Sequence, residues 1–303
     1  MKSLKIAVEY ERGLHDAATF MVVNRAPDFL YHPLNIEHSL LQKVCTRLQK
    51  FLKFPLDAEK GETKYFHEEG TLHQDEFNSL PASSLDELCA DFLKAEEISD
   101  HICKELGAVN IPISENGAGR AKINPGVQHR IYGYEAVFGK EAVERLIKIS
   151  GIHLHLDQYK PRLGDQFNAL TALRPTIALT STSPISHQGE NSANCHRYKI
   201  FADPNYGVFA AVPEEIKYIS RIEDLMARDK RRHETWVKRF KSGKGKVKDL
   251  PPNYDFCEAF PRERTGYPDI RYRPDMGTGT FEMRINDTAP LDIVLAQAGL
   301  VLG

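Results

Sequence analysis

Four short segments of the sequence alternate apolar residues with carboxylates, imidazoles or guanidinium groups. The segments are LKIAVEYE (4–11), LHQDEFNS (72–79), GIHLHLD (151–157) and GTGTFEMRIND (277–287). Successive side chains of a β-strand point to opposite faces, so each segment would gather its ionisable residues on one face. Glu9 and Glu11 would then stand about 7 Å apart, a spacing suited to carboxylates that bind divalent cations.

The types of these residues favour a binding site over a solvated surface. The shared faces would carry Gln74, Glu76 and Asn78, then His153, His155 and Asp157, then Thr280, Glu282, Arg284 and Asn286. Any one of these strands, taken alone, is explained equally well by the solvent-exposed face of an antiparallel sheet. Acids and imidazoles together suit Mg²⁺ or Mn²⁺, however, and an arginine beside such an ion requires an anion such as phosphate. Faces that converge on a curved sheet would hold a metal-bound nucleotide.

The overall composition limits the partners of such a site. Of 303 residues, 40 are Lys or Arg and 42 are Asp or Glu, so the net charge is −2. A nearly neutral chain has no global attraction to nucleic acid or to an anionic membrane, and we expect neither as a partner. Hydrophobic residues make up 41% and charged residues 27%, which is typical of a globular protein.

The cysteines and the N-terminal residues favour a reducing, cytoplasmic location. Five cysteines are scattered without a Cys-x-x-Cys pair, which argues against a disulfide framework and against a structural zinc site. No apolar run approaches the roughly 18 residues that a membrane helix needs. The opening MKSLKIAVEYERG places acids where a signal peptide would keep its apolar stretch.

Four predicted helices must help to position these strands. Their ranges are about 34–52, 84–106, 134–149 and 165–175, from the spacing of apolar residues. Ser84 and Glu87 form a capping box at the start of the second helix, and Gly107 can adopt the left-handed conformation after its end. Pro175 should end or kink the fourth helix.

One segment, residues 228–248, is strongly basic, with ten Lys or Arg against two acids. It is either a solvated helix that continues into a loop, or a lid that brings cations to a polyanionic substrate such as a nucleoside triphosphate. It is not a P-loop, because it lacks the required Gly-Lys-Ser/Thr spacing. Trp236, the only tryptophan, is expected to anchor this helix.

Several segments resemble the carboxylate–amine ligase branch of the glutamate–cysteine ligase superfamily. They are VEYE (8–11), HQDEFNSLPASSLDEL (73–88), GIHLHLD (151–157), PTIALTSTSPISHQGENSANCHR (175–197) and RYRPDMGTGTFEMRIND (271–287). VEYE is similar to the family's first Glu-x-Glu strand, and HQDEFNS is similar to its second acidic strand. The resemblance covers nearly the whole chain in the right order.

The resemblance implies an α+β fold with a strongly bent antiparallel sheet, related to the catalytic domain of glutamine synthetase. The sheet would form a funnel-like active site, with helices packed on its outer face, in a single catalytic domain over residues 1–303. The implied reaction uses ATP to convert a small amino-acid-like carboxylate into an acyl phosphate, which an amine then converts into an amide. A homo-oligomer is compatible with the resemblance.

The resemblance also implies roles for individual residues. The metal ligands, for two or three Mg²⁺ or Mn²⁺ ions, would be Glu9, Glu11, Glu76, His153 and Glu282. Arg284 and Arg273 would be catalytic and face the transferred phosphoryl group. Arg197, His155 and Arg271 would bind substrate, although His155 could instead hydrogen-bond a neighbouring metal ligand, and Arg271 competes with Arg273 on the same strand face.

Two other classes of function stay open from the residues themselves. A metal-dependent amide hydrolase is the first, because His-x-His with distant carboxylates also describes some zinc amidohydrolases. Converging arginines have no evident task in such a site. A nucleic-acid-binding module that uses residues 228–248 is the second, and the nearly neutral net charge argues against it. The region 110–134 lacks a Gly-Thr-His-Pro-like segment common in the family, so the sequence does not identify the substrates.

Overall fold

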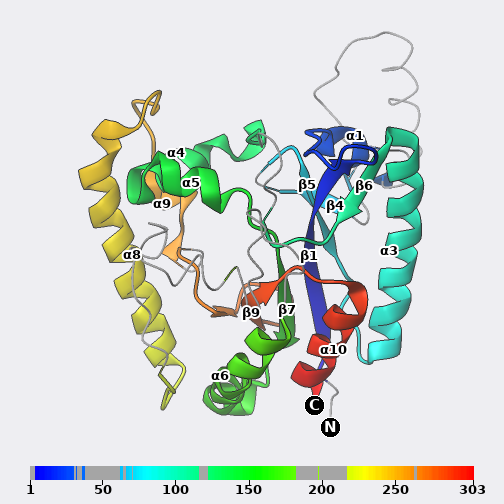
Figure 1. Ribbon diagram of the computed structural model, residues 1–303. Coiled ribbons are helices and arrows are strands. Elements are labelled where there is room, and N and C mark those ends of the chain that lie inside the picture. The colour runs from blue at the N-terminus through cyan, green and yellow to red at the C-terminus, as the bar shows by residue number, and fades with distance from the viewer. Residues whose placement is uncertain are drawn as a thin grey trace.

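The computed structural model describes residues 4–30, 32, 36–37, 62–63, 66–69, 71–115, 122–181, 197, 217–262 and 265–303. These residues form a mixed α+β fold around a seven-stranded antiparallel sheet (Figure 1). The strand order is β4-β5-β1-β7-β9-β8, with β6 paired to β1, and the sheet is open rather than closed into a barrel. The strands are β1 (Ile6–Asp16), β4 (Phe66–Glu68), β5 (Gln74–Asn78), β6 (Ala108–Ile111), β7 (Gly151–Asp157), β8 (Ile270–Arg273) and β9 (Thr280–Asp287).

The apolar face of the sheet packs against three helices, as the predicted fold class requires. These helices are α3 (Leu85–Leu106), α6 (Leu163–Thr180) and α10 (Leu291–Leu302). Alternate strand residues such as Val8, Leu154 and Met283 join the helices in one buried cluster. Burying each such side chain contributes about 1.5–3 kcal/mol, so this face fixes which side of every strand points inward. The opposite, polar face is thereby left for the site.

Helix α3 begins and ends where its sequence predicts. The Ser84 side chain accepts a hydrogen bond from the backbone N–H of Glu87 at 3.2 Å, and the Glu87 carboxylate accepts one from the N–H of Ser83 at 2.7 Å. Gly107 follows the helix with φ 65° in the left-handed region. The N-cap at Ser84 and the glycine stop are therefore confirmed, whereas the Glu87 carboxylate bonds the N–H of the residue before the N-cap and not that of Ser84 itself, as a capping box would.

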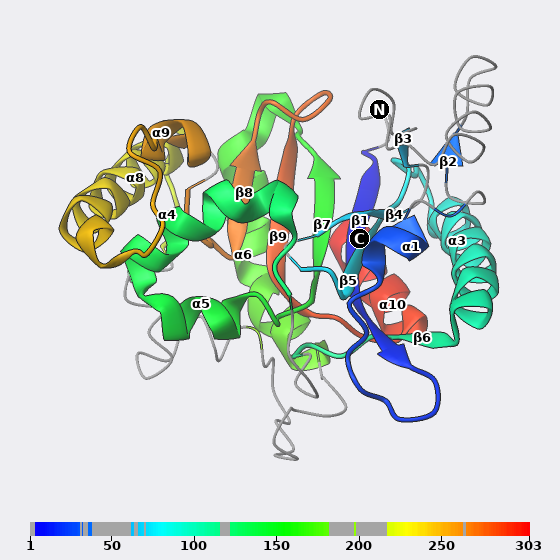
Figure 2. The same ribbon diagram turned by 90° about the horizontal axis from the view of Figure 1, so that it is seen from above.

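A second group of helices lies on the other side of the sheet from α3 (Figures 1 and 2). It consists of α4 (Gln128–Phe138), α5 (Lys140–Leu146), α8 (Glu223–Gly243) and α9 (Phe256–Ala259). Trp236 of α8 is 1% exposed and packs with Phe138 and Phe260 at ring-centroid distances of 4.9 and 5.8 Å. Trp236 thus anchors α8, as predicted. No helix in the described part of the chain is long and apolar enough to cross a membrane.

The remaining elements are short. Helix α1 spans Ala26–Leu30, and strands β2 (Ile36–Glu37) and β3 (Glu62–Thr63) form a separate two-stranded sheet. Turns of 3-10 helix span Pro125–Val127, Lys160–Arg162 and Lys244–Lys246. Of the helix predicted over 34–52, only residues 36–37 are described, as a strand, and the rest lies outside the described residues.

Two predicted helices differ from the observed ones. The helix predicted over 134–149 is two helices. Helix α4 begins earlier, at Gln128, and α5 begins at Lys140, after Gly139, whose φ of 89° is not helical. Helix α6 continues past Pro175 to Thr180 instead of ending near the proline. Ile177 in this last turn is fully buried in the main cluster, and we attribute the continuation to that burial, which offsets the lost hydrogen bond.

Candidate active site

Strand pairing brings the predicted acids and His153 side by side on the polar face. In the β1–β5 pair, Glu11 lies opposite Glu76. In the β1–β7 pair, Glu9 lies opposite His153. Opposed residues in an antiparallel pair have Cβ atoms about 4.5–5.5 Å apart. Residues from widely separated segments of the sequence therefore form one row across the sheet.

The row continues onto the last two strands. His155 of β7 lies opposite Glu282 of β9, and Arg271 of β8 lies opposite Glu282 from the other side. Figure 2 shows β8, β9, β7 and β1 following one another across the sheet. Glu282 therefore stands between an imidazole and a guanidinium group.

Asn286 does not share this face, contrary to the sequence-based expectation. Between the pairs Leu154–Met283 and Ile152–Asn286, strand β9 has one residue more than β7, which is a β-bulge. Because of the extra residue, the side chains at the end of β9 point to the opposite faces of the sheet from those expected. The Asn286 side chain donates a hydrogen bond to Oε1 of Gln297 on α10 at 3.0 Å, on the helix-covered side.

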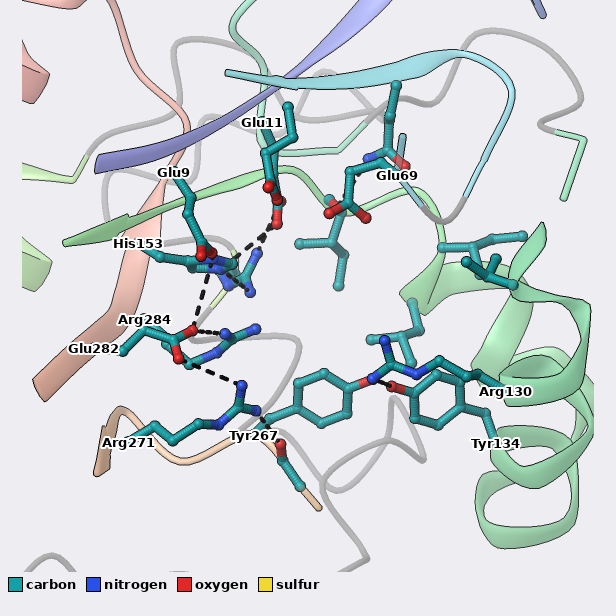
Figure 3. A pocket seen from close by; sticks show the side chains of 18 of the residues that line it. Glu9, Glu11, Glu69, Arg130, Tyr134, His153, Tyr267, Arg271, Glu282 and Arg284 are labelled. Carbon is teal, nitrogen blue, oxygen red and sulfur yellow. Dashed lines mark hydrogen bonds and ion pairs between the residues drawn. The ribbon is translucent and has the colours of Figure 1, made fainter. Parts of the chain in front are cut away.

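The polar face borders a cavity of about 470 Å³ (Figure 3). Nine of the ten residues predicted for the site line it: Glu9, Glu11, Glu76, His153, Arg197, Arg271, Arg273, Glu282 and Arg284. The tenth, His155, is 4% exposed and is not a lining residue. Its Nε2 atom lies 2.9 Å from Oε1 of Glu9, so it contacts a lining carboxylate from behind.

Hydrogen bonds define the protonation state of His153. Its Nε2 atom lies 3.0 Å from Nη2 of Arg197, and its Nδ1 atom lies 2.6 Å from Oε2 of Glu9. A guanidinium group only donates, so Nε2 accepts and the proton on Nδ1 is donated to Glu9. Burial, with the charge of Arg284, holds the pKa of His153 well below its ordinary value. The imidazole is therefore neutral.

Glu9 is ionised despite its burial. Burial raises the pKa of the Glu9 carboxyl group, but the hydrogen bond from His153 and the close contact with His155 lower it by more, and the net pKa lies well below the ordinary value. Two imidazole groups thus hold one carboxylate in its charged form.

Three other carboxyl groups repel one another at the β5 end of the cavity. Burial raises the pKa of Glu11 to about 7, and the charge of Glu69 contributes. Burial also raises the pKa of Glu76 well above its ordinary value, and the negative charges of Glu69 and Glu9 raise it further. A bound divalent cation would relieve this repulsion.

The acids and histidines offer three groups of potential cation ligands. The groups are Glu9, Glu76 and His153; Glu11, Glu69 and Glu76; and Glu9, His155 and Glu282. Within each group, one ligand atom per residue lies within 4.8 Å of the others. Carboxylate oxygens with an occasional imidazole nitrogen are the donors that Mg²⁺ and Mn²⁺ prefer, so the donor set fits these ions.

Arginines crowd around Glu282 at the other end of the row. Its fully buried carboxylate contacts Arg273 at 3.1 Å, Arg271 at 3.5 Å and also Arg284. Burial, together with neighbouring arginines, lowers the pKa of Arg271 to about 10 and that of Arg284 to about 9. One carboxylate faces three guanidinium groups, and the excess positive charge suits a phosphate or carboxylate ligand.

The opposite wall of the cavity was not predicted. Figure 3 shows Arg130 and Tyr134 on α4, across the cavity from His153 and Glu282. Arg130 donates a hydrogen bond to the Tyr134 hydroxyl group at 3.2 Å. Tyr267 and Glu69 also line the cavity. Arg130 and Tyr134 are four residues apart, which places them on one face of a helix, but the predicted helix began only at residue 134.

The basic segment 228–248 does not line this cavity. Most of it is helix α8, which packs against α4 through Trp236. Arg239, Lys246 and Lys248 instead line a second cavity of about 970 Å³ beside α4. Movement of the segment as a lid stays a prediction.

Comparisons with known proteins show similarity at the level of structure. No protein-family model matches the sequence, and no curated protein matches it. The fold is similar to that of a bifunctional glutathione synthetase from Pasteurella multocida, with a TM-score of 0.55 and 16% identity over 99% of this chain and 38% of that chain. It is also similar to glutamate–cysteine ligase from Francisella tularensis, solved in complex with AMP, with a TM-score of 0.51 and 14% identity over 99% of this chain and 66% of that chain.

These two likenesses concern the fold. The chain spans less than two thirds of the length of either protein. The fold relationship to glutamate–cysteine ligase that the sequence segments implied is thereby confirmed, as is the α+β class with its antiparallel sheet.

Proposed function

We propose that the protein is an ATP-dependent carboxylate–amine ligase that forms an amide through an acyl phosphate. The observation that carries the proposal is the division of charge within one cavity, with carboxylates and an imidazole at one end and a cluster of arginines at the other. Phosphoryl transfer requires charge neutralisation and alignment more than a protein nucleophile, and this arrangement supplies both. The fold likeness to a synthetase and a ligase supports the same class.

In this proposal the carboxylate end holds the divalent cations. Two or three Mg²⁺ or Mn²⁺ ions would be held by Glu9, Glu11, Glu76 and His153, with Glu282, which contacts three arginines, as a further ligand at the border with the arginine end. When bound, the ions would neutralise the triphosphate of ATP and orient its terminal phosphoryl group. Glu9 is ionised, and His153 is neutral with its lone pair on Nε2, so a cation bound there would take the place of Arg197 as the partner of that nitrogen.

The arginine end would hold the reacting groups. Arg284 and Arg273 would face the transferred phosphoryl group, and Arg271 would bind substrate carboxylate or phosphate. Arg197, which lies against Glu11 and His153 at the carboxylate end, would bind substrate carboxylate or phosphate from there. The carboxylate oxygen attacks the terminal phosphorus and ADP leaves. The amine then attacks the acyl carbon, phosphate leaves, and the amine gives up a proton. His155 contacts Glu9 and does not line the cavity. We therefore assign it the role of positioning Glu9, and not that of binding substrate.

The test is an assay of ADP and phosphate release. The protein is incubated with ATP, Mg²⁺ and pools of amino acids and amines, and each pool is omitted in turn. We expect release that requires both a carboxylate and an amine, with an amide product found by mass spectrometry. Cleavage of amides without any nucleotide would instead support the alternative, a metal-dependent amide hydrolase.

Several expectations accompany this proposal without a structural test. They are a single catalytic domain over residues 1–303, cytoplasmic localisation and a homo-oligomeric state. Size-exclusion chromatography with light scattering measures the oligomeric state directly.

A further inference from the structure

The second cavity, of about 970 Å³ beside α4, is separate from the candidate active site. Its lining residues come from α4, from the start of α5, and from the end of α8 with the turn that follows. None of these residues lines the candidate active site. Cavities of about 300–1,000 Å³ hold small molecules in proteins, so this one is large enough for a ligand of its own.

The contact between α8 and α4 places basic side chains at this cavity. Gly243 at the end of α8 lies directly against the backbone of Ala136 in α4 (Figure 1). Arg239 lies one turn before Gly243 and is half-buried. A 3-10 turn follows the helix, and Lys246 and Lys248, within and after that turn, line the same cavity as Arg239. Basic groups from the helix and from the turn are thereby gathered around one space.

The lining of the cavity carries more positive than negative charge. Its basic residues are Lys140, Arg239, Lys246 and Lys248, and its acidic residues are Glu135 and Asp249. Lys140 is balanced by acids, because its Nζ atom lies 4.0 Å from Oε1 of Glu144 and Glu135 is also close. Burial raises the pKa of Glu135, and the charge of Lys140 opposes that shift. Lys140 is therefore not available as an unpaired cation.

The other three basic groups have no partner of opposite charge. Arg239, Lys246 and Lys248 form no ion pair within the residues that the structure describes. Together with the exposed carboxylate of Asp249, the unpaired lining groups carry three positive charges and one negative charge, a net charge of +2. Like charges at one cavity repel one another, and a bound anion with at least two negative charges would relieve the repulsion.

We propose that this cavity binds a small molecule with a diphosphate group. Arg239 would hold phosphate oxygens through two parallel hydrogen bonds, and Lys246 and Lys248 would supply the remaining positive charge. Each phosphate group carries at least one negative charge at neutral pH, so a diphosphate matches the unpaired charge of the lining, whereas a single carboxylate does not. Tyr132 and Phe138 also line the cavity and offer contacts to an aromatic ring. The site lies outside the ligase site proposed above and goes beyond that function.

The experiment measures how an anion protects individual lysines from acetylation by acetic anhydride, in the full chain without Mg²⁺ or ATP. No described residue that lines the candidate active site is a lysine, so protection of Lys246 and Lys248 does not arise from an anion bound there. We expect saturating inorganic diphosphate to slow acetylation of both lysines about fivefold, as measured by mass spectrometry. Lys230 and Lys238, exposed on α8 outside the cavity, should react at an unchanged rate. Malonate, a dicarboxylate, should protect less at the same concentration.

A variant tests the part of Arg239. In Arg239→Gln the concentration of inorganic diphosphate that half-protects Lys246 and Lys248 should rise about tenfold. The matched control is Lys238→Gln, at the preceding residue of α8 and outside the cavity, which should leave that concentration unchanged.

Adenosine diphosphate distinguishes the two sources of a diphosphate group. Half-protection at a lower concentration than with inorganic diphosphate would identify a nucleotide as the ligand, and half-protection at an equal concentration would identify the free anion.

Three results would overturn the proposal. The first is the absence of protection at Lys246 and Lys248 in the original protein, which requires no variant. The second is equal protection of Lys230 and Lys238, because diphosphate would then only screen the basic surface. The third is equal protection by malonate, because the cavity would then not select phosphate. None of these results depends on turnover, so none bears on the proposed ligase function.

Discussion

Glu282 is the single carboxylate that three guanidinium groups share, and it is fully buried. Its replacement by glutamine keeps the shape of the side chain but removes the charge. Buried cations that lose their partner destabilise a protein by about 3–5 kcal/mol. The residue is thus both part of the candidate site and part of what allows the arginines to lie together.

We therefore expect Glu282→Gln to lose the proposed ligase turnover by about a hundredfold or more, while staying folded with reduced stability. Steady-state ADP release measures the first effect, and circular dichroism during urea unfolding measures the second. Glu258→Gln, at an exposed glutamate on α9, serves as control and should change neither. Full activity in Glu282→Gln would exclude this residue from the site.

His73 is a buried histidine outside the site, and its burial affects how the stability of the protein depends on pH. It is 0% exposed, and neither ring nitrogen has a hydrogen-bond partner in the described part of the chain. Burial lowers the pKa of His73 to about 3, and the charges of His15 and Lys148 add to the effect. The folded protein therefore keeps this imidazole neutral where the unfolded chain, with a pKa near 6.5, binds a proton.

Stability should accordingly be lost on acidification. The contribution of neutral His73 is fully present above about pH 6.5 and declines as the pH falls toward about 3, by at most about 1.4 kcal/mol per pH unit. His73→Leu should reduce that slope, as measured by urea unfolding between about pH 7 and pH 4.5. An unchanged slope would show that His73 does not titrate in this way, and His129→Leu is the control with an exposed histidine.

Helices α4 and α8 cross at a single glycine. A Cβ atom at Gly243 would collide with the backbone carbonyl oxygen of Ala136, whereas one at Gly245 meets nothing within 4 Å. Backbone cannot move aside as a flexible side chain does. The crossing therefore sets how closely α8 supports α4, which carries Arg130 of the cavity wall.

We expect Gly243→Ala to destabilise the protein by about 1–3 kcal/mol, because the two helices must separate. Gly245→Ala, two residues later, should leave the midpoint of thermal unfolding nearly unchanged. Differential scanning calorimetry of both variants makes the comparison. Equal midpoints would mean that the crossing tolerates a methyl group.

For helices and strands, prediction from the sequence succeeded where the signal lies within a few neighbouring residues. Ser84, Glu87 and Gly107 define α3 by chemistry within a few residues. It missed one local signal, Gly139, a glycine that ends α4 with φ 89° as Gly107 ends α3. It also failed where tertiary structure decides, because the turning of Asn286 depends on pairing with β7. The spacing of apolar residues within each segment indicates neither feature.

Across the whole molecule, the polar face of the sheet was predictable and the opposite wall was not. Period-two alternation assigns Glu9, His153 and Glu282 to one face of their strands, and strand order then brings them together. Arg130 and Tyr267 reach the cavity only because α4 and the segment before β8 pack there. Their position at the cavity depends on how helices α4, α5, α8 and α9 pack together, and no local pattern in the sequence indicates that packing.

The position of Trp236 has a practical consequence. It is the only tryptophan of the chain, and its ring lies 6.1 Å from Tyr134, a residue of the cavity wall. Indole emission responds to the polarity and motion of its surroundings, so the protein contains an optical reporter beside its candidate site. Titration with nucleotide or substrate should change the intrinsic fluorescence, and binding becomes measurable without dyes, labels or knowledge of the product.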